Sequence, residues 1–215
     1  MIGNQELKEF IESTYLNLLE NQEGEVADYI PQLKKVNPEL FGISACLLDG
    51  TIISKGDTDK QFCLQSCAKP LTYCLARELS DLKKVHQHVG YEPSGRAFNS
   101  FCLNNDNLPH NPLINAGAIM TTALIENDKE PADRFECIKD FYQNMSGNTG
   151  MIGFENSVFL SEKHHADRNT SLAYYMKENK AFPEGFSPTD IQRTLDLYFQ
   201  TCSITLDCKT ASIIC

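Results

Sequence analysis

Ser66 and Lys69 have the spacing of a nucleophile and its base. They lie in an apolar stretch, residues 61–79, that predicts the start of a helix. Positions three apart share one helix face, so the Ser66 hydroxyl and the Lys69 amine can meet. Serine attacks well only after a base takes its proton, and lysine is that base only when neutral. Apolar neighbours such as Phe62 and Leu71 lower the lysine pKa from about 10.4. The pattern therefore indicates acyl-transfer chemistry.

A Ser-x-x-Lys pattern also has a purely structural interpretation. About one chance occurrence is expected in a chain of this length. A second one is present, Ser80-Asp81-Leu82-Lys83, and its charged surroundings favour a helix N-cap at Ser80. The first pattern differs because apolar residues surround it. On spacing and context alone, the catalytic and structural interpretations of Ser66 and Lys69 carry equal weight.

Composition and charge limit the number of domains and the kinds of partner expected for this chain. The 215 residues suffice for one large or two small domains, and 41% of them are hydrophobic. A net charge of −10 and a pI of about 4.9 argue against binding to nucleic acid or to an anionic membrane surface. No stretch is apolar and long enough to span a bilayer. No basic, apolar leader follows Met1, so we expect any targeting segment to be absent from this chain.

The cysteines and histidines give little support to a disulfide frame or a metal site. The nine cysteines are odd in number and scattered through apolar runs, which predicts reduced, buried thiols. We therefore expect a reducing compartment, either the cytosol or the mitochondrial matrix. No Cys-x-x-Cys occurs, and the histidines lack metal-ligand spacing. His164-His165 is the exception, and two surface residues are the favoured interpretation.

Periodicity predicts the elements that must position the Ser66 region. Apolar residues at helical spacing indicate helices over 5–20 and 131–145. Two strands, 41–48 and 51–54, flank an Asp49-Gly50 hairpin turn. Further helices are expected from Glu25, over 80–90, from Asn115 to Ile125, over 156–162, from Asp167, from Ser187, and from a Thr205 cap to Cys215.

Three local features leave their roles open. Residues 99–112 form a long polar loop, which usually moves or binds something, and its Phe101 and Leu103 need a partner surface. Asn115 is either a helix cap, which local sequence favours, or an amide aimed into a site. Tyr29 is best explained locally as a half-buried packing residue. The apolar run 212–215 has no stop signal, so we expect the chain to be a fragment.

Several longer motifs, taken together, resemble the serine-dependent glutaminases, most closely the animal kidney-type and liver-type enzymes. They span nearly the whole chain in the same order and with similar spacing, at residues 25–33, 62–70, 109–112, 115–119, 167–169 and 182–185. The Ser-x-x-Lys pattern alone also resembles the β-lactamases and penicillin-binding proteins. Their companion motifs, Ser-Asp-Asn and Lys-Thr-Gly, are absent from this sequence.

The resemblance implies a fold and an activity. The fold is α+β, of the β-lactamase/transpeptidase-like type, with a helical cluster beside an α+β sandwich. The activity is hydrolysis of L-glutamine to L-glutamate and ammonia, with no metal or organic cofactor. By resemblance, Ser66 is the nucleophile and Lys69 its base. The substrate-binding positions, also by resemblance, are Tyr29, Gln65, Asn115, Glu162, Asn169 and Tyr198.

The resemblance further implies that residues 1–215 are the N-terminal portion of a glutaminase catalytic domain whose remainder, with several strands, is missing. We therefore expect this chain to be inactive alone. The family suggests a homotetramer, phosphate as an activator, and the mitochondrial matrix, with the cytoplasm as the alternative. One departure is Phe101-Cys102, where kidney-type enzymes carry a Leu-Phe pair. Two other hypotheses stay open: a penicillin-recognising acyl-transfer protein, and a non-catalytic glutaminase-like subunit or fragment.

Overall fold

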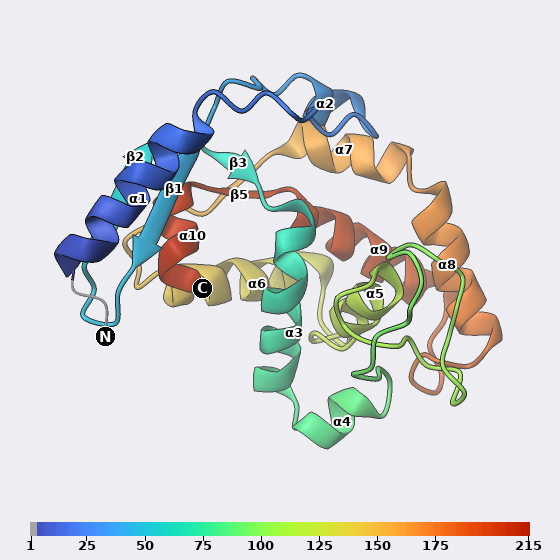
Figure 1. Cartoon of the computed structure of the whole chain (residues 1–215). Helices are drawn as coiled ribbons and strands as arrows, with labels where there is room; N and C mark the ends of the chain where they lie inside the picture. Colours follow the sequence, from blue (N-terminus) through green and yellow to red (C-terminus); the bar gives the residue numbers. More distant parts are fainter. Residues whose placement is uncertain (1–3) are drawn as a thin grey trace.

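Helices make up most of the regular structure in the computed structural model, which describes residues 4–215, and the strands are short (Figure 1). The helices are α1 (Asn4–Leu18), α2 (Pro31–Lys34), α3 (Ala68–Leu79), α4 (Leu82–His86), α5 (Asn115–Ala123), α6 (Pro131–Met145), α7 (Asn156–His164), α8 (Asp167–Glu178), α9 (Pro188–Cys202) and α10 (Cys208–Ile214). A 3-10 turn, η1 (Gln65–Cys67), precedes α3. The strands are β1 (Gly42–Cys46), β2 (Ile52–Gly56), β3 (Phe62–Cys63), β4 (Gly153–Phe154) and β5 (Ile204–Leu206).

The strands form two small antiparallel sheets. Strands β1 and β2 are the predicted hairpin, and Gly50 at its turn has a φ of 83°, which glycine tolerates. Helix α1 packs on this hairpin, and α10 packs on β1 (Figure 1). The hydroxyl of Ser44 lies 2.9 Å from that of Ser54 and 3.0 Å from that of Ser212 on α10. In the second sheet, β5 pairs with β3 on one side and β4 on the other. This sheet ties the chain just before Ser66 to the segment after α9.

Helix α5 lies at the centre of the helical cluster. All nine of its residues are buried, and it packs against α3, α8 and α9. Its small side chains allow this close approach, as the sequence predicted. At Gly117 a Cβ atom would overlap the carbonyl oxygen of Asn111 in the preceding loop. That loop therefore rests directly on the α5 backbone.

The ends of several helices match their sequence signals. Ser187 and Asp190 form a capping box at the start of α9, with Pro188 in the first turn. Residues 156–162 and the stretch from Asp167 are helical, as expected. None of the helices within residues 4–215 combines the length and apolarity that crossing a bilayer requires.

Three predicted helix starts are wrong. The helix expected from Glu25 begins only at Pro31, because residues 21–28 have no regular structure. Asp81, not Ser80, caps α4, and its side chain accepts from the Lys84 amide at 2.8 Å. Thr205 lies in β5, where strand pairing overrides its capping preference. The cap of α10 is instead Asp207.

The cysteine prediction is partly wrong. All nine thiols are free, but three of them, Cys67, Cys74 and Cys215, are exposed. Cys67 and Cys74 lie on the outer surface of α3 and its preceding turn, since the apolar stretch there buries only one helix face.

Replacing Gly117 with alanine is expected to lower the free energy of unfolding by about 1–3 kcal/mol, the usual cost of overpacking. The added methyl group must displace the Asn111 carbonyl, which is backbone and cannot rotate away. Urea denaturation of the natural full-length protein measures this change. Gly24→Ala is the matched control, because nothing lies within 4 Å of its Cβ position. Equal midpoints for the two variants would contradict the proposed close approach.

Candidate active site

The side chains of Ser66 and Lys69 meet, as the sequence predicted. The Lys69 Nζ lies 2.6 Å from the Ser66 Oγ. Ser66 is exposed, whereas Lys69 is only 6% exposed. Burial lowers the pKa of Lys69 below its ordinary value, and nearby groups, Cys202 first among them, oppose this shift. An accessible hydroxyl therefore sits beside an amine that loses its proton more readily than an exposed lysine does.

Strand pairing and a sharp turn position the backbone just before Ser66. Before it, the Leu64 amide donates to the Ile204 carbonyl at 2.9 Å, which continues the pairing of β3 with β5. Gln65 then adopts a φ of 49°, in the left-handed region that non-glycine residues seldom occupy. Such strain persists where the surroundings enforce it, and it often marks a functional site. Here the sharp turn places Ser66 at the entrance of α3.

Tyr29, Gln65 and Glu162 form a polar group beside the serine. The Tyr29 hydroxyl lies 2.7 Å from Gln65 Oε1 and 2.9 Å from Glu162 Oε1. One hydroxyl proton can serve only one acceptor. With the Gln65 amide reversed, its nitrogen donates to Tyr29 and leaves the tyrosine proton for Glu162. Tyr29 is 58% exposed, so the half-buried packing role is wrong: its ring projects from the segment before α2 toward α7.

The side-chain carboxylate of Glu162 is unusual because it is buried. It is 8% exposed on α7, and burial raises the pKa of its carboxyl, while hydrogen bonds with Tyr29 and Gln65 oppose that shift. No ion pair within 4 Å is present for it in the described part of the chain. A buried carboxylate without a cation is suited to bind one.

Asn115 and Asn169 come together from α5 and α8. The Asn115 Nδ2 donates to Asn169 Oδ1 at 3.0 Å. The local expectation of a helix cap is wrong, since Ile114 occupies the N-cap position and Asn115 is the first helical residue. Asn115 is 8% exposed, and its Oδ1 has no partner within residues 4–215. The amide is therefore aimed at another element rather than at its own helix end.

Tyr198 is the most deeply placed of the candidates. It is 5% exposed on α9, and burial raises the pKa of its hydroxyl well above the ordinary value. Helix α9 packs against η1 and α3, which carry Ser66 and Lys69. The hydrogen bonds of the described residues do not connect the Tyr198 side chain to either of them. Burial also raises the pKa of the neighbouring Cys202 thiol, to about 12.

A cavity of about 340 Å³ opens at the serine–lysine pair. It is lined by Ser66, Lys69, Pro70, Phe98 and Leu113. Sequence reasoning missed Phe98 and Leu113. Both flank the polar loop predicted over 99–112, and an apolar residue at each end of a polar loop is the signal that could have found them. The cavity is of a size suited to a small solute.

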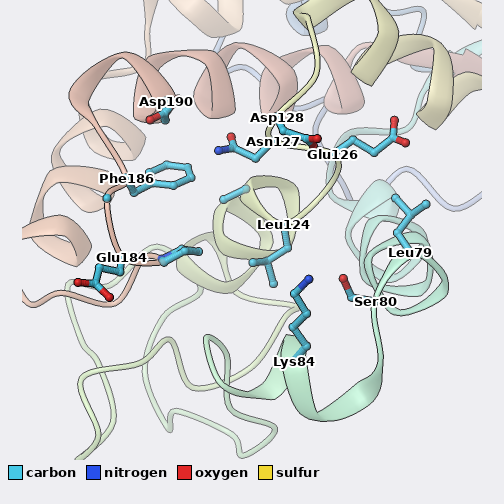
Figure 2. Close-up of a pocket in the computed structure, with 13 residues that line it drawn as sticks. Leu79, Ser80, Lys84, Leu124, Glu126, Asn127, Asp128, Glu184, Phe186 and Asp190 are labelled. Atoms are coloured by element: carbon cyan, nitrogen blue, oxygen red, sulfur yellow. The ribbon is translucent and has the colours of Figure 1, made fainter.

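Several larger hollows lie elsewhere on the described residues. One, of about 490 Å³, is lined by residues that include Leu79, Ser80, Lys84, Glu184 and Asp190 (Figure 2). Leu79 is the last residue of α3, so this cavity lies at the opposite end of that helix from Ser66. Another, of about 770 Å³, lies between residues 32–42 and the β3–β5–β4 sheet. We place the chemistry at the smaller cavity because it contains the close hydroxyl–amine pair.

Metal-ligating side chains do not gather in the described residues. Among residues 4–215, no group of three His, Cys, Asp or Glu side chains could hold a metal ion. His164 and His165 are exposed, with ring centroids 4.8 Å apart, which agrees with their interpretation as surface residues.

Comparison with known proteins gives one consistent result. The family model described as Glutaminase matches residues 24–215. The chain is 46% identical over 191 residues to the mitochondrial liver isoform of glutaminase from Rattus norvegicus, covering 89% of this chain and 31% of that protein. It is 47% identical to putative glutaminase 3 of Caenorhabditis elegans, covering 90% and 33%. It is 40% identical to glutaminase 2 of Clostridium perfringens, covering 94% and 66%. The chain thus spans about a third of the length of these animal relatives.

Solved structures confirm the predicted α+β fold. A probable glutaminase, ybaS, matches with a TM-score of 0.86 at 29% identity, covering 95% of this chain and 64% of that one. Mglu in its glutamate form also matches with a TM-score of 0.86, at 27% identity, covering 97% and 46%. Since the family model covers most of the sequence and the fold agrees with it, this chain belongs to the glutaminase family.

Proposed function

We propose that the protein hydrolyses L-glutamine to L-glutamate and ammonia, with Ser66 as nucleophile and Lys69 as base. The observation that carries the proposal is the 2.6 Å separation between an exposed Ser66 hydroxyl and a buried Lys69 amine. The names of the animal and bacterial relatives support the choice of glutamine. The solved relative Mglu in its glutamate form supports it as well.

The reaction has two halves. Neutral Lys69 takes the Ser66 proton as Oγ attacks the side-chain carbonyl carbon of glutamine. The lysine ammonium gives its proton to the amide nitrogen of the tetrahedral intermediate, the C–N bond breaks, and the nitrogen leaves as ammonia. The γ-glutamyl ester left on Ser66 is then attacked by water, whose proton passes to Lys69 and back to the serine oxygen. Glutamate leaves and both side chains return to their starting states.

The remaining candidate residues suit a zwitterionic substrate. We assign the buried Glu162 carboxylate, with Tyr29, to the substrate ammonium, because opposite charges compensate each other's desolvation. The amides of Asn115 and Asn169 can donate to the substrate carboxylate. Gln65 and Tyr198 complete the surroundings of the serine. The steps need no metal or organic cofactor.

Other properties of the family extend this proposal. We propose a homotetramer that phosphate activates, supported by the family resemblance alone. A mitochondrial location is supported by the name of the liver isoform, and the cytoplasm is the alternative.

Ser66→Ala in the natural full-length protein is expected to reduce ammonia release from glutamine by at least about 1,000-fold, the usual scale for loss of a nucleophile. Ser80→Ala is the matched control, because it alters the second Ser-x-x-Lys at the far end of α3. We expect its turnover to stay within about twofold of the original, as for substitutions outside a site. Unchanged turnover in Ser66→Ala would exclude Ser66 as nucleophile. Covalent labelling of Ser66 by a β-lactam, without glutamine turnover, would favour a penicillin-recognising protein.

The rate constant kcat/KM for glutamine is expected to rise with pH as Lys69 loses its proton. Because burial lowers the pKa of Lys69, this rise should be centred below about 10.4, the value of an exposed lysine. Lys69→Arg should be inactive throughout, since a guanidinium stays protonated. Lys83→Arg, at the second pattern, should keep the original profile. A Lys69→Arg variant with the same pH profile would show that another group is the base.

A further inference from the structure

The ring of Phe101 is held between two side chains of α8. The Arg168 Cζ lies 4.5 Å from the Phe101 ring centroid, over its face. The Tyr175 ring meets it edge-on, with centroids 5.9 Å apart and planes at 85°. Arg168 and Tyr175 are seven residues apart, so they lie on one face of the helix. Within residues 4–215, Arg168 makes no ion pair, so its charge is directed at the ring.

A second attachment lies three residues earlier. The backbone amide of Asn115 donates to the Phe98 carbonyl at 2.9 Å. The side chain of Asn115 donates to Asn169, the neighbour of Arg168. Together these contacts form a closed circuit. Phe98 is bonded to Asn115, and Asn115 to Asn169, whose neighbour in the chain, Arg168, contacts Phe101. The loop backbone then joins Phe101 to Phe98. The circuit joins loop, α5 and α8.

The circuit borders the cavity at Ser66. Residues 97–113 contain no helix or strand, so their path depends on individual contacts, which include the Phe101 ring contacts and single backbone hydrogen bonds such as that of Phe98. Phe98 and Leu113, at the two ends of this segment, line the cavity with Ser66 and Lys69. Loosening Phe101 therefore frees a cavity wall and removes the contact beside Asn169.

We propose that Phe101 and Arg168 are positioning residues, which clamp residues 97–113 to α8 and so fix the Phe98 wall and the Asn115–Asn169 pair. The clamp is a cation–π contact reinforced by an edge-to-face aromatic contact. Its effect on glutamine binding rests on the proposed function. The clamp itself does not.

The first experiment tests the clamp without any reaction. Hydrogen exchange is measured at the amides of Ser100 and Cys102, which flank Phe101 and donate to Ala97 and Ser100 at 3.0 Å. Phe101→Leu and Arg168→Gln in the full-length protein should each speed this exchange about three- to tenfold, the scale of one such contact. Phe101→Tyr should retain the original exchange, and so should Phe10→Leu, a control on exposed α1.

The double variant Phe101→Leu/Arg168→Gln separates a shared contact from two independent ones. If the two residues act through each other, its exchange is no faster than that of the faster single variant. Two results would overturn the clamp. One is a double variant whose exchange is accelerated by the product of the two single-variant factors. The other is unchanged exchange in both single variants.

The second experiment tests the consequence for the substrate. Phe101→Leu should raise KM for glutamine about three- to tenfold while kcat stays within about twofold, because binding groups move and the dyad does not. Phe101→Tyr should restore the original KM. An unchanged KM in a protein that does hydrolyse glutamine would overturn the positioning role. A wild-type protein without glutamine hydrolysis would refute the proposed function, and the exchange measurements would still decide the clamp.

Discussion

The burial of one amine is the constraint on which the site depends. For the proposed reaction Lys69 must lose solvent, which makes its neutral form easier to reach, while Ser66, one turn away, must remain accessible. The lowered pKa of Lys69 has a cost in stability. Below that pKa the folded chain must bury an ammonium that the unfolded chain would hydrate, and stability rises as pH climbs toward the unfolded value. The surrounding core must supply this free energy, and α5 and α9 provide much of that core.

The polar groups around the dyad depend on tertiary structure in a second way. Tyr29 and Glu162 are 133 positions apart in sequence, and Asn115 and Asn169 are 54 apart. Each pair meets because two different helices, or a helix and an irregular segment, are packed against the same core. Among the described residues the buried Glu162 carboxylate has no ion pair and the Asn115 Oδ1 has no hydrogen-bond partner, and both are costly. The carboxylate is suited to a ligand ammonium, whereas the NH₂ groups of the two asparagines are suited to a ligand carboxylate, and the proposed substrate carries both.

Sequence patterns predicted the features that depend on residues close together in the chain. The long helices, the β1–β2 hairpin and the Ser66–Lys69 contact all follow from periodicity or spacing. Strands β3, β4 and β5 have only two or three residues each, too few to show an alternating apolar and polar pattern. The sequence therefore predicted a helix cap at Thr205, which lies in β5. Asn115 was misjudged for a related reason, because its partner lies on another helix. Resemblance to a family selected the candidate site residues, and the structure shows how several of them meet.

The contacts that hold the cavity wall differ in kind from those that hold the dyad. Lys69 and Ser66 sit on a turn fixed by sheet pairing and by the buried face of α3. Residues 109–111 are held more closely to neighbouring backbone, whereas Phe98 is tied by one backbone hydrogen bond, and the half-exposed ring of Phe101 adds a contact three residues further on. Contacts of this second kind are weak enough to break on the timescale of loop motion. In the proposed reaction a small solute enters and its products leave past this wall. A firmly fixed Ser66–Lys69 pair beside a more lightly held Phe98 would suit that proposal, since the chemistry requires fixed geometry and the exchange of substrate requires movement.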